Sequence, residues 1–440
     1  MRVIIFDLDL TLASTEACHA YLRSNLGRQD IVPALKSGGV SVSFYGAELV
    51  AYFNSLKFSP GCCVAVVSDS PKDYCVQVLA QGGYQIADWL VFGSQSKPLV
   101  KQEVISEAIA QGLGVDVDDL SFLVVGDSPK DIYYAHAIKA PSVFVSWGSK
   151  QVQQANYSVP SAWADTVQEL KGHVERFVRG DLEFEFVDFR KLYLTVAPNS
   201  KEFIRVALSD DDIGFGKDYI KNKDNYRGVE DKWAATELHS VVKQAKNLSA
   251  KDHEARIGTP LYGVNGLYNA FAFKAKAWHF KNDFTAWCRS KNITGNVLLV
   301  PVPPSVPREC NLTHSMSLMC GWWKYWINSE NFGINVRIHD AFERFWPKVP
   351  SHQTTGWREM DEQFDTLGVF NEIKGKVKKI DFVVIVDDVV TSGSHMNAVA
   401  SFMRTAEMVD EGVVIFGYAL FKTLRVDASN DIDWSFLDDL

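Results

Sequence analysis

The chain lacks any long apolar run. Its first apolar stretch, Val3–Phe6, is cut short at once by Asp7, and no other segment approaches the length of a membrane helix. A signal peptide or a bilayer-spanning helix needs a longer uninterrupted stretch of apolar residues. We therefore expect neither a secretory leader nor a membrane partner.

Cysteine is also scarce, with 7 residues in 440. Cys62 and Cys63 are adjacent, the others are scattered, and no pair has the CxxC spacing of a zinc or redox site. The sequence predicts reduced thiols and a cytoplasmic location. Fold-scale repeats and low-complexity tracts are absent from it as well, which excludes solenoid and fibrous classes.

The chain also has no excess of positive charge. Its net charge is −9, which argues against indiscriminate nucleic-acid binding. One stretch differs, because residues 256–358 hold 12 Lys and Arg against 5 Asp and Glu, and 7 of the 12 Trp. Such a stretch can stack the bases of a single strand. Alternatively, the aromatic side chains form a core and the charges a solvated face. Nucleic acid stays a possible but less favoured partner.

What the sequence does contain is a set of short apolar strands that end in polar residues. Val3–Phe6, Val64–Val67 and Phe122–Val125 lie in the first part of the chain, and Val297–Val300 and Phe382–Val386 in the last. Such runs are typical of buried parallel strands. With 440 residues we expect more than one domain. The sequence predicts an α/β protein with two Rossmann-like, doubly wound parallel-sheet domains.

The first strand ends in Asp7 and Asp9, which share one face of an extended segment. Two such carboxylates favour divided roles, one as nucleophile or metal ligand and one as general acid and base. The second strand ends in Ser68, and the third is followed by Asp127 and Asp131. These oxygen-rich groups are ligands that Mg²⁺ prefers.

The motifs from Asp7 to Asp131, in this order, closely resemble the phosphatases of the haloacid dehalogenase-like (HAD) superfamily. The resemblance implies that Asp7 attacks phosphorus and that Asp9 is the general acid and base. It also implies that Ser68 binds the phosphoryl group and that Lys97, with Lys101 as the alternative, neutralises charge. The Mg²⁺ ligands that it implies form a set of four: Asp7, Asp9, Asp127 and Asp131.

This resemblance also places a cap at about residues 12–60, where Glu16–Leu26 and Gly46–Leu56 have helical spacing. A small helical cap leaves the site open to bulky substrates. We expect the phosphatase domain to span residues 1–178. A connecting or accessory segment would follow over 179–250, and a second domain over 251–440.

The strand Phe382–Val386 ends in Asp387 and Asp388, followed by the small, hydroxyl-rich loop of Thr391, Ser392, Gly393 and Ser394. Adjacent acids can accept hydrogen bonds from vicinal ribose hydroxyls, and the loop can wrap a phosphate at a helix start. The alternative is an ordinary strand–turn–helix corner. Unliganded adjacent acids at the end of a buried strand are costly, which favours a ligand site.

This corner closely resembles the phosphoribosyl diphosphate (PRPP) signature of type I phosphoribosyltransferases, and the Pro301–Pro304 turn is loosely similar to the ComF-like group. The resemblance implies that Asp387 and Asp388 hold the ribose. Thr391, Ser392, Gly393 and Ser394 would cradle the 5-phosphate. Pyrophosphate would face a set of basic residues: Arg308 with Arg344, Lys348 or Arg358. His395 stands where that family has Thr.

Two phosphate-handling signatures on one chain predict a bifunctional enzyme of nucleotide metabolism. Its ligands would be a phosphorylated small molecule or nucleotide and PRPP or another ribose 5-phosphate compound, with Mg²⁺ as cofactor. Two alternatives stay open at this point. One is a phosphatase that processes nucleic-acid ends, and the other is a phosphatase regulated by a PRPP-sensing domain without catalysis.

Overall fold

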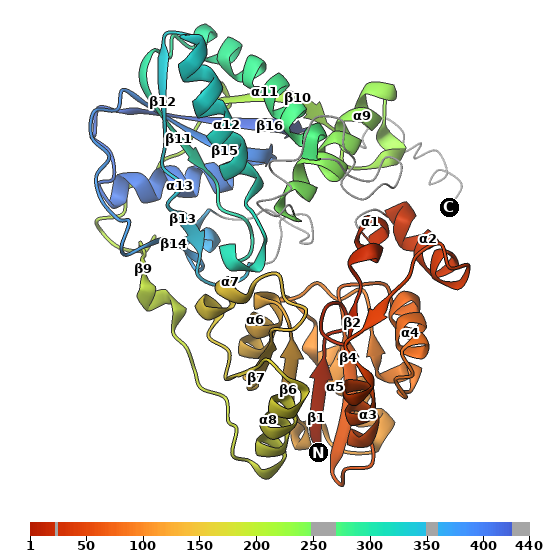
Figure 1. The fold of residues 1–440 in the computed structure, drawn as a ribbon. Helices are drawn as coiled ribbons and strands as arrows, with labels where there is room; N and C mark the ends of the chain where they lie inside the picture. Colours follow the sequence, from red (N-terminus) through yellow and green to blue (C-terminus); the bar gives the residue numbers. More distant parts are fainter. Residues whose placement is uncertain (23–24, 248–269, 349–359, 425–440) are drawn as a thin grey trace, which may run out of the picture.

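The computed structural model describes residues 1–22, 25–247, 270–348 and 360–424 (Figure 1). These residues form two α/β units, an N-terminal unit (1–180) and a C-terminal unit (193–424). Each unit is built on a parallel sheet that is covered on both faces. The prediction of an α/β chain with two doubly wound parallel sheets is confirmed.

The N-terminal sheet has the order β5-β4-β1-β6-β7-β8, and all neighbouring strands are parallel. Its strands are β1 (Arg2–Phe6), β4 (Cys62–Val67), β5 (Val91–Phe92), β6 (Ser121–Gly126), β7 (Ser142–Val145) and β8 (Ala162–Ala164). The winding reverses between β1 and β6. Ligands of open α/β sheets bind beyond the carboxyl ends of the strands at this point.

Apolar side chains on both faces explain why these segments form central strands. Ile4 and Phe6 of β1 lie in one core cluster, whereas Val3 and Ile5 lie in the cluster on the opposite face. Because successive side chains of a strand alternate between faces, such a run is stable only between two layers of helices. The helices are α1 (His19–Leu22), α2 (Asn25–Lys36), α3 (Ala47–Leu56), α4 (Lys72–Gln81), α5 (Gln102–Leu113), α6 (Pro129–Ala137), α7 (Val152–Ser158) and α8 (Val167–Arg179).

The cap differs from the one expected over residues 12–60. A short antiparallel pair, β2 (Ala13–Ser14) with β3 (Ser43–Phe44), encloses α1 and α2, which lie on the side facing the C-terminal unit (Figure 1). In contrast, α3 buries Leu49, Phe53 and Leu56 in the core of the main sheet. Its apolar face makes α3 a helix of the main fold, so the insertion is smaller than predicted.

The C-terminal sheet has the order β10-β16-β15-β11-β12, again all parallel. The strands of this sheet are β10 (Ile213–Tyr219), β11 (Gly295–Pro301), β12 (Ile334–Ile338), β15 (Phe382–Val390) and β16 (Val414–Thr423). Leu299 and Val384 face a cluster with α11 (Ala270–Ser290) and α12 (Ser315–Glu330). Leu298 and Val383 face the opposite cluster with α13 (Ser394–Thr405).

The segment 179–250 is not a separate connector. Its strand β10 forms an edge of the C-terminal sheet, and its strand β9 (Tyr193–Leu194) pairs with β14 (Leu367–Phe370) in a small sheet completed by β13 (Phe342–Arg344). Helix α9 (Val229–Glu237) packs its alanines into the core of the C-terminal unit. The expected boundary at residue 250 is therefore wrong: the C-terminal unit already includes β9 and β10.

The tryptophans of the basic stretch lie mainly on α11 and α12, where they pack. Trp323 is fully buried and stacks on Phe284. The Nζ of Lys281 lies 3.7 Å from the ring centroid of Trp278. This packing supports the core interpretation over a stacking platform for bases. Within the described ranges, no helix combines the length and the hydropathy that a bilayer crossing requires.

Candidate active site and a second carboxylate site

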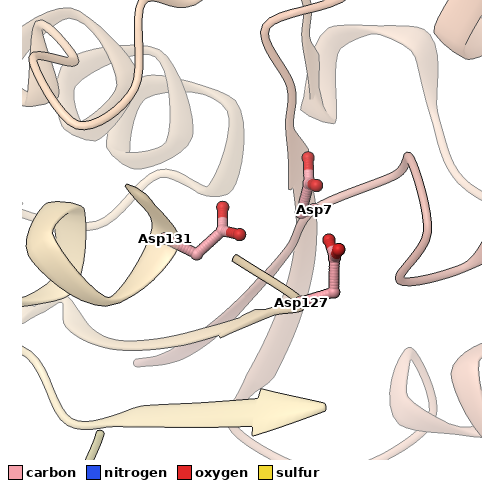
Figure 2. Close-up of side chains that lie close together, drawn as sticks. All are labelled: Asp7, Asp127 and Asp131. Atoms are coloured by element: carbon pink, nitrogen blue, oxygen red, sulfur yellow. The ribbon is translucent and has the colours of Figure 1, made fainter. Parts of the chain in front are cut away.

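Three acidic side chains converge at the winding reversal of the N-terminal sheet (Figure 2). Asp7 follows β1, Asp127 follows β6, and Asp131 lies in the first turn of α6. One carboxylate oxygen from each lies within 4.8 Å of the others, and all three side chains are buried. The pairing of β1 with β6 therefore brings together residues far apart in the chain.

The start of α6 is ordered by local signals. Ser128 is the N-cap, Pro129 follows, and the Asp131 carboxylate accepts a hydrogen bond from the Ser128 N–H in a capping box. Such a box satisfies free N–H groups at a helix start and fixes the direction of the chain. The same geometry leaves Asp131 Oδ1 directed toward Lys97.

Lys97 is the cation of this site. Its Nζ lies 2.6 Å from Asp7 Oδ1 and 2.5 Å from Asp131 Oδ1, and the side chain is buried. Burial by itself would lower the pKa of Lys97, but the carboxylates of Asp131 and Asp7 outweigh it and hold the pKa well above its ordinary value. Lys97 therefore stays charged, whereas the alternative, Lys101, is exposed.

The acid cluster holds more negative charge than Lys97 can balance. Burial, opposed by Lys97 and reinforced by Asp131, raises the pKa of Asp7 well above its usual range. Burial and Asp131 raise the pKa of Asp127 to about 8, although Thr11 Oγ1 donates to Asp127 at 3.2 Å. Buried carboxylates are stable when a cation or protons neutralise them. Three clustered carboxylate oxygens fit a hard divalent cation such as Mg²⁺.

The Asp9 carboxylate has a different set of hydrogen-bond partners. Its carboxylate accepts hydrogen bonds from Ser70 at 2.6 Å, from Tyr74 at 2.9 Å and from Ser68 at 3.3 Å. Among the described residues, Asp9 is not part of the acid cluster around Asp7. Asp9 therefore has a different set of partners from the three clustered acids, although the sequence predicts it as a fourth metal ligand.

Ser70 and Tyr74 were not among the predicted site residues. Ser70 lies two positions after Ser68, at the start of the loop before α4, and Tyr74 lies in the first turns of that helix. Burial, reinforced by Asp9, raises the pKa of Tyr74 far above its usual value, so its phenol stays a hydrogen-bond donor. A second hydroxyl close behind the end of β4 was the available signal for Ser70. Only the fold could reveal Tyr74.

A second carboxylate site lies at the carboxyl end of β15. Asp387 is buried, and its Oδ1 accepts the N–H of Asp388 at 2.8 Å. Burial raises the pKa of both carboxyls to about 6. In sheet order β15 lies beside β11, the place where this sheet also reverses its winding. The predicted ribose-binding acids therefore occupy a location typical of ligand sites.

The loop after these acids forms the start of α13. Gly393 has a φ of +73°, a left-handed conformation that favours glycine. Thr391 pairs its hydroxyl with Thr423 at 2.9 Å, and the hydroxyls of Ser392 and Ser394 lie 2.6 Å apart. The predicted phosphate-binding residues therefore lie together on one tight turn beside the two acids.

His395 connects this loop to a buried arginine. Arg344 donates to His395 Nε2 at 3.2 Å, and His395 Nδ1 lies 3.8 Å from Asp387. Because a guanidinium only donates, Nε2 accepts and the Nδ1–H faces Asp387. Arg344 is 1% exposed and also bonds Gln363 and Thr366. These bonds hold its guanidinium against Gln363, Thr366 and His395, whereas the sequence predicted that it faces pyrophosphate.

Arg308 is held by acidic partners. Its guanidinium donates two hydrogen bonds to Asp340, at 2.8 and 3.1 Å, and its Nε lies 3.2 Å from Glu343. The backbone N–H of Lys348 donates to the Ser305 carbonyl at 2.7 Å, so Lys348 lies beside the Pro-rich loop. Arg358 lies outside the described residues. The structure thus brings together the residues that the sequence predicts to bind ribose and phosphate, and it pairs Arg308 with acids.

Comparisons with known proteins complete the description. The search of protein-family models gave no match, and neither did the search of curated proteins. Solved structures similar to part of the chain include a hydrolase from Pseudomonas syringae, with 15% identity over 40% of this chain and 99% of that one, at a TM-score of 0.31. A predicted phosphatase from Clostridium acetobutylicum has 18% identity over 40% and 98%, at 0.30. A predicted phosphoglycolate phosphatase from Haemophilus somnus has 20% identity over 38% and 96%, at 0.29.

Proposed function

We propose that the N-terminal unit is an Mg²⁺-dependent phosphomonoesterase of the HAD type. The observation that carries the proposal is the buried cluster of Asp7, Asp127 and Asp131 around Lys97. An Asp7 oxygen attacks phosphorus and the ester P–O bond breaks, while Asp9 gives its proton to the leaving oxygen. Asp9 then takes a proton from water, which attacks phosphorus and releases phosphate and free Asp7.

The cation would be held by Asp7, Asp127 and Asp131. When bound, it supplies positive charge to the phosphoryl oxygens. Lys97 adds positive charge at the nucleophile. Ser68, whose hydroxyl donates to Asp9, would bind a phosphoryl oxygen. Ser70 and Tyr74 orient the Asp9 carboxylate. Preorganised groups of this kind stabilise the charge of the transition state without rearranging.

Phosphate release from a broad panel of phosphomonoesters, including p-nitrophenyl phosphate, tests this function. We expect turnover with Mg²⁺, loss of turnover with a chelator, and a loss of at least about a thousandfold in Asp7→Asn. Asp116→Asn, an exposed acid on the same unit, is the matched control and retains activity. A wild-type protein that releases no phosphate from the whole panel contradicts the proposal.

We further propose that the C-terminal unit binds PRPP or another ribose 5-phosphate compound at Asp387, Asp388 and the Thr391–Ser394 turn. The supporting observation is the pair of acids beside a hydroxyl-lined helix start at a winding reversal. A transferase acting in nucleotide metabolism is the first candidate. The pairing of Arg308 with Asp340 favours a second candidate, a binding domain that senses PRPP.

Calorimetry with PRPP, followed by assay of diphosphate release with a panel of nucleobases, separates the two candidates. Binding with turnover supports a transferase, and binding without turnover supports a sensor. Asp387→Asn with Asp388→Asn should weaken binding at least about tenfold, since each acid accepts a ribose hydroxyl. If PRPP does not bind the wild type, both candidates are wrong.

A further inference from the structure

His395 lies between the second carboxylate site and a buried arginine. It directly follows Ser394, the last residue of the hydroxyl-lined turn, in the first turn of α13. Its Nε2 lies 3.2 Å from Arg344 Nη2, and its Nδ1 lies 3.8 Å from Asp387 Oδ2. The two ring nitrogens therefore lie beside two different charged groups, one on β13 and one on β15.

Arg344 fixes which ring nitrogen carries the proton. Its guanidinium donates to the Gln363 carbonyl at 2.7 Å, to Gln363 Oε1 at 2.7 Å and to Thr366 Oγ1 at 2.9 Å. Arg344 and Gln363 are each 1% exposed, so packing holds the guanidinium in place. Because a guanidinium only donates, Nε2 of His395 is the acceptor and the ring proton lies on Nδ1. His395 thus presents an N–H to Asp387.

The distance of 3.8 Å between Nδ1 of His395 and Oδ2 of Asp387 is longer than a direct hydrogen bond, which spans about 2.7–3.2 Å. Asp387 Oδ1 accepts the Asp388 N–H at 2.8 Å, whereas Oδ2 is the oxygen on the His395 side. The His395 side chain is 25% exposed and that of Asp387 13%, so both can be reached from solvent. The pair therefore offers a bound molecule a donor and an acceptor next to each other.

A sugar hydroxyl needs both of these partners, because it donates one hydrogen bond and accepts others. Ionised carboxylates only accept, so Asp387 and Asp388 can take the protons of two hydroxyls but give nothing to their oxygens. The Nδ1–H of His395 supplies the missing donor. One hydroxyl can then accept from His395 and donate to Asp387. A phosphate dianion only accepts, and the carboxylate would repel it.

We propose that His395 is a specificity residue that recognises a ribose hydroxyl together with Asp387. The phosphate is left to the Thr391–Ser394 turn. Arg344 is a positioning residue in this scheme, because it acts through His395 and sets the tautomer that donates. This inference rests on the proposed ribose 5-phosphate site of the C-terminal unit and names the group that selects the sugar.

Two phosphate monoesters test the proposal. Ribose 5-phosphate and methyl phosphate carry the same kind of phosphate group, but only the first has sugar hydroxyls. Calorimetry measures the affinity of ribose 5-phosphate, and displacement of ribose 5-phosphate measures that of methyl phosphate. A chelator is present throughout, because the N-terminal acid cluster without a cation repels phosphate and does not turn the ligands over.

His395→Ala should weaken ribose 5-phosphate about tenfold and methyl phosphate less than about twofold, since the lost bond is one to the sugar. His395→Asn should restore most of the affinity for ribose 5-phosphate, because its amide places an N–H close to the position of Nδ1. His279→Ala removes an exposed histidine of α11 and is the matched control that keeps both affinities.

The tautomer of His395 gives an independent test. The imidazole signal that disappears from the ¹⁵N spectrum in His395→Ala belongs to this ring. We expect a protonated Nδ1 and an unprotonated Nε2 in the wild type. The opposite tautomer overturns the roles of Arg344 and His395.

The outcomes separate this inference from the proposed site. Equal losses of ribose 5-phosphate and methyl phosphate in His395→Ala would assign His395 to the phosphate, and no loss of either would leave it without a role; both results overturn the inference. A wild type that does not bind ribose 5-phosphate, or an Asp387→Asn, Asp388→Asn double variant that binds it equally well, instead contradicts the site itself.

Discussion

The hydroxyl of Tyr133 donates a 2.5 Å hydrogen bond to the carboxylate of Glu309, across the contact between the two units. Burial raises the pKa of Glu309, and the bond from Tyr133 opposes this rise. Tyr133 lies two residues after Asp131, and Glu309 lies next to Arg308. This hydrogen bond therefore connects α6, the helix that carries Asp131, to the segment of Arg308 and Glu309 in the C-terminal unit.

Tyr133→Phe should lower the free energy of unfolding by about 1.5–3 kcal/mol, because a partly buried carboxylate loses its donor. The ring packing against Phe189 and Trp346 stays, so the hydroxyl accounts for the loss. Urea denaturation measures it. Tyr157→Phe, with an exposed ring on α7, is the control and should change stability by less than about 0.5 kcal/mol. Equal effects of the two substitutions would contradict this role of the bond.

Lys97→Met should destabilise the N-terminal unit by about 3–5 kcal/mol near neutral pH, because Asp7 and Asp131 lose their buried cation. Lys101→Met removes the exposed alternative and should cost less than about 0.5 kcal/mol. Thermal denaturation compares the two. Phosphatase turnover should vanish in Lys97→Met and persist in Lys101→Met. The reverse pattern would assign the charge to Lys101.

Mg²⁺ should raise the melting temperature, because it binds the folded acid cluster of Asp7, Asp127 and Asp131 and not the unfolded chain. At a concentration of about 100 Kd the gain is about 2.7 kcal/mol. Asp127→Asn should remove most of this gain, and Asp116→Asn should leave it intact. Scanning fluorimetry with and without a chelator provides the measurement. A melting temperature indifferent to Mg²⁺ in the wild type argues against the metal site.

The second carboxylate site predicts a dependence on pH. Burial raises the pKa of Asp387 and Asp388 from 3.8 to about 6, so the folded state binds these protons more tightly than the unfolded state. Without ligand, this contribution to stability therefore increases as the pH falls from about 7 toward about 4. A ribose ligand needs ionised acceptors, so its affinity should fall as the pH drops below about 6.

Calorimetry with PRPP across this range measures the affinity, and the Asp387→Asn, Asp388→Asn double variant serves as the reference. Its weaker binding should lose most of the dependence on pH. An affinity of the wild type that stays flat from about pH 7 to about pH 5 would falsify the assignment of these acids to the ribose.

Much of the fold could be predicted because buried parallel strands leave a continuous apolar signal, as in Val64–Val67 and Phe382–Val386. The place of β10 in the C-terminal sheet could not, since Ile213–Tyr219 mixes polar residues with glycine. It is an edge strand and is only partly covered, so its pattern stays weak. Helix α3 was predicted as a helix, but its packing on the main sheet depends on neighbours distant in the chain.

The candidate site likewise combines residues that the sequence predicts with relationships that only the fold reveals. The sequence predicted Asp7, Asp127 and Asp131 as one set together with Asp9, and the fold brings only the first three together among the described residues. Lys97 was predicted with Lys101 as a rival, and only the packed fold separates the buried residue from the exposed one. The bonds of Asp9 with Ser70 and Tyr74 likewise depend on the loop after β1 lying beside the start of α4.

By itself, the sequence determined which strand ends carry acid and hydroxyl groups, because these groups follow short apolar strands in a local pattern. Tertiary structure alone decided what those groups face. It pairs Arg308 with Asp340, buries Arg344 beside His395, and joins Tyr133 to Glu309. These relationships join segments far apart in the chain, and only the packing of whole sheets and helices brings such segments within reach.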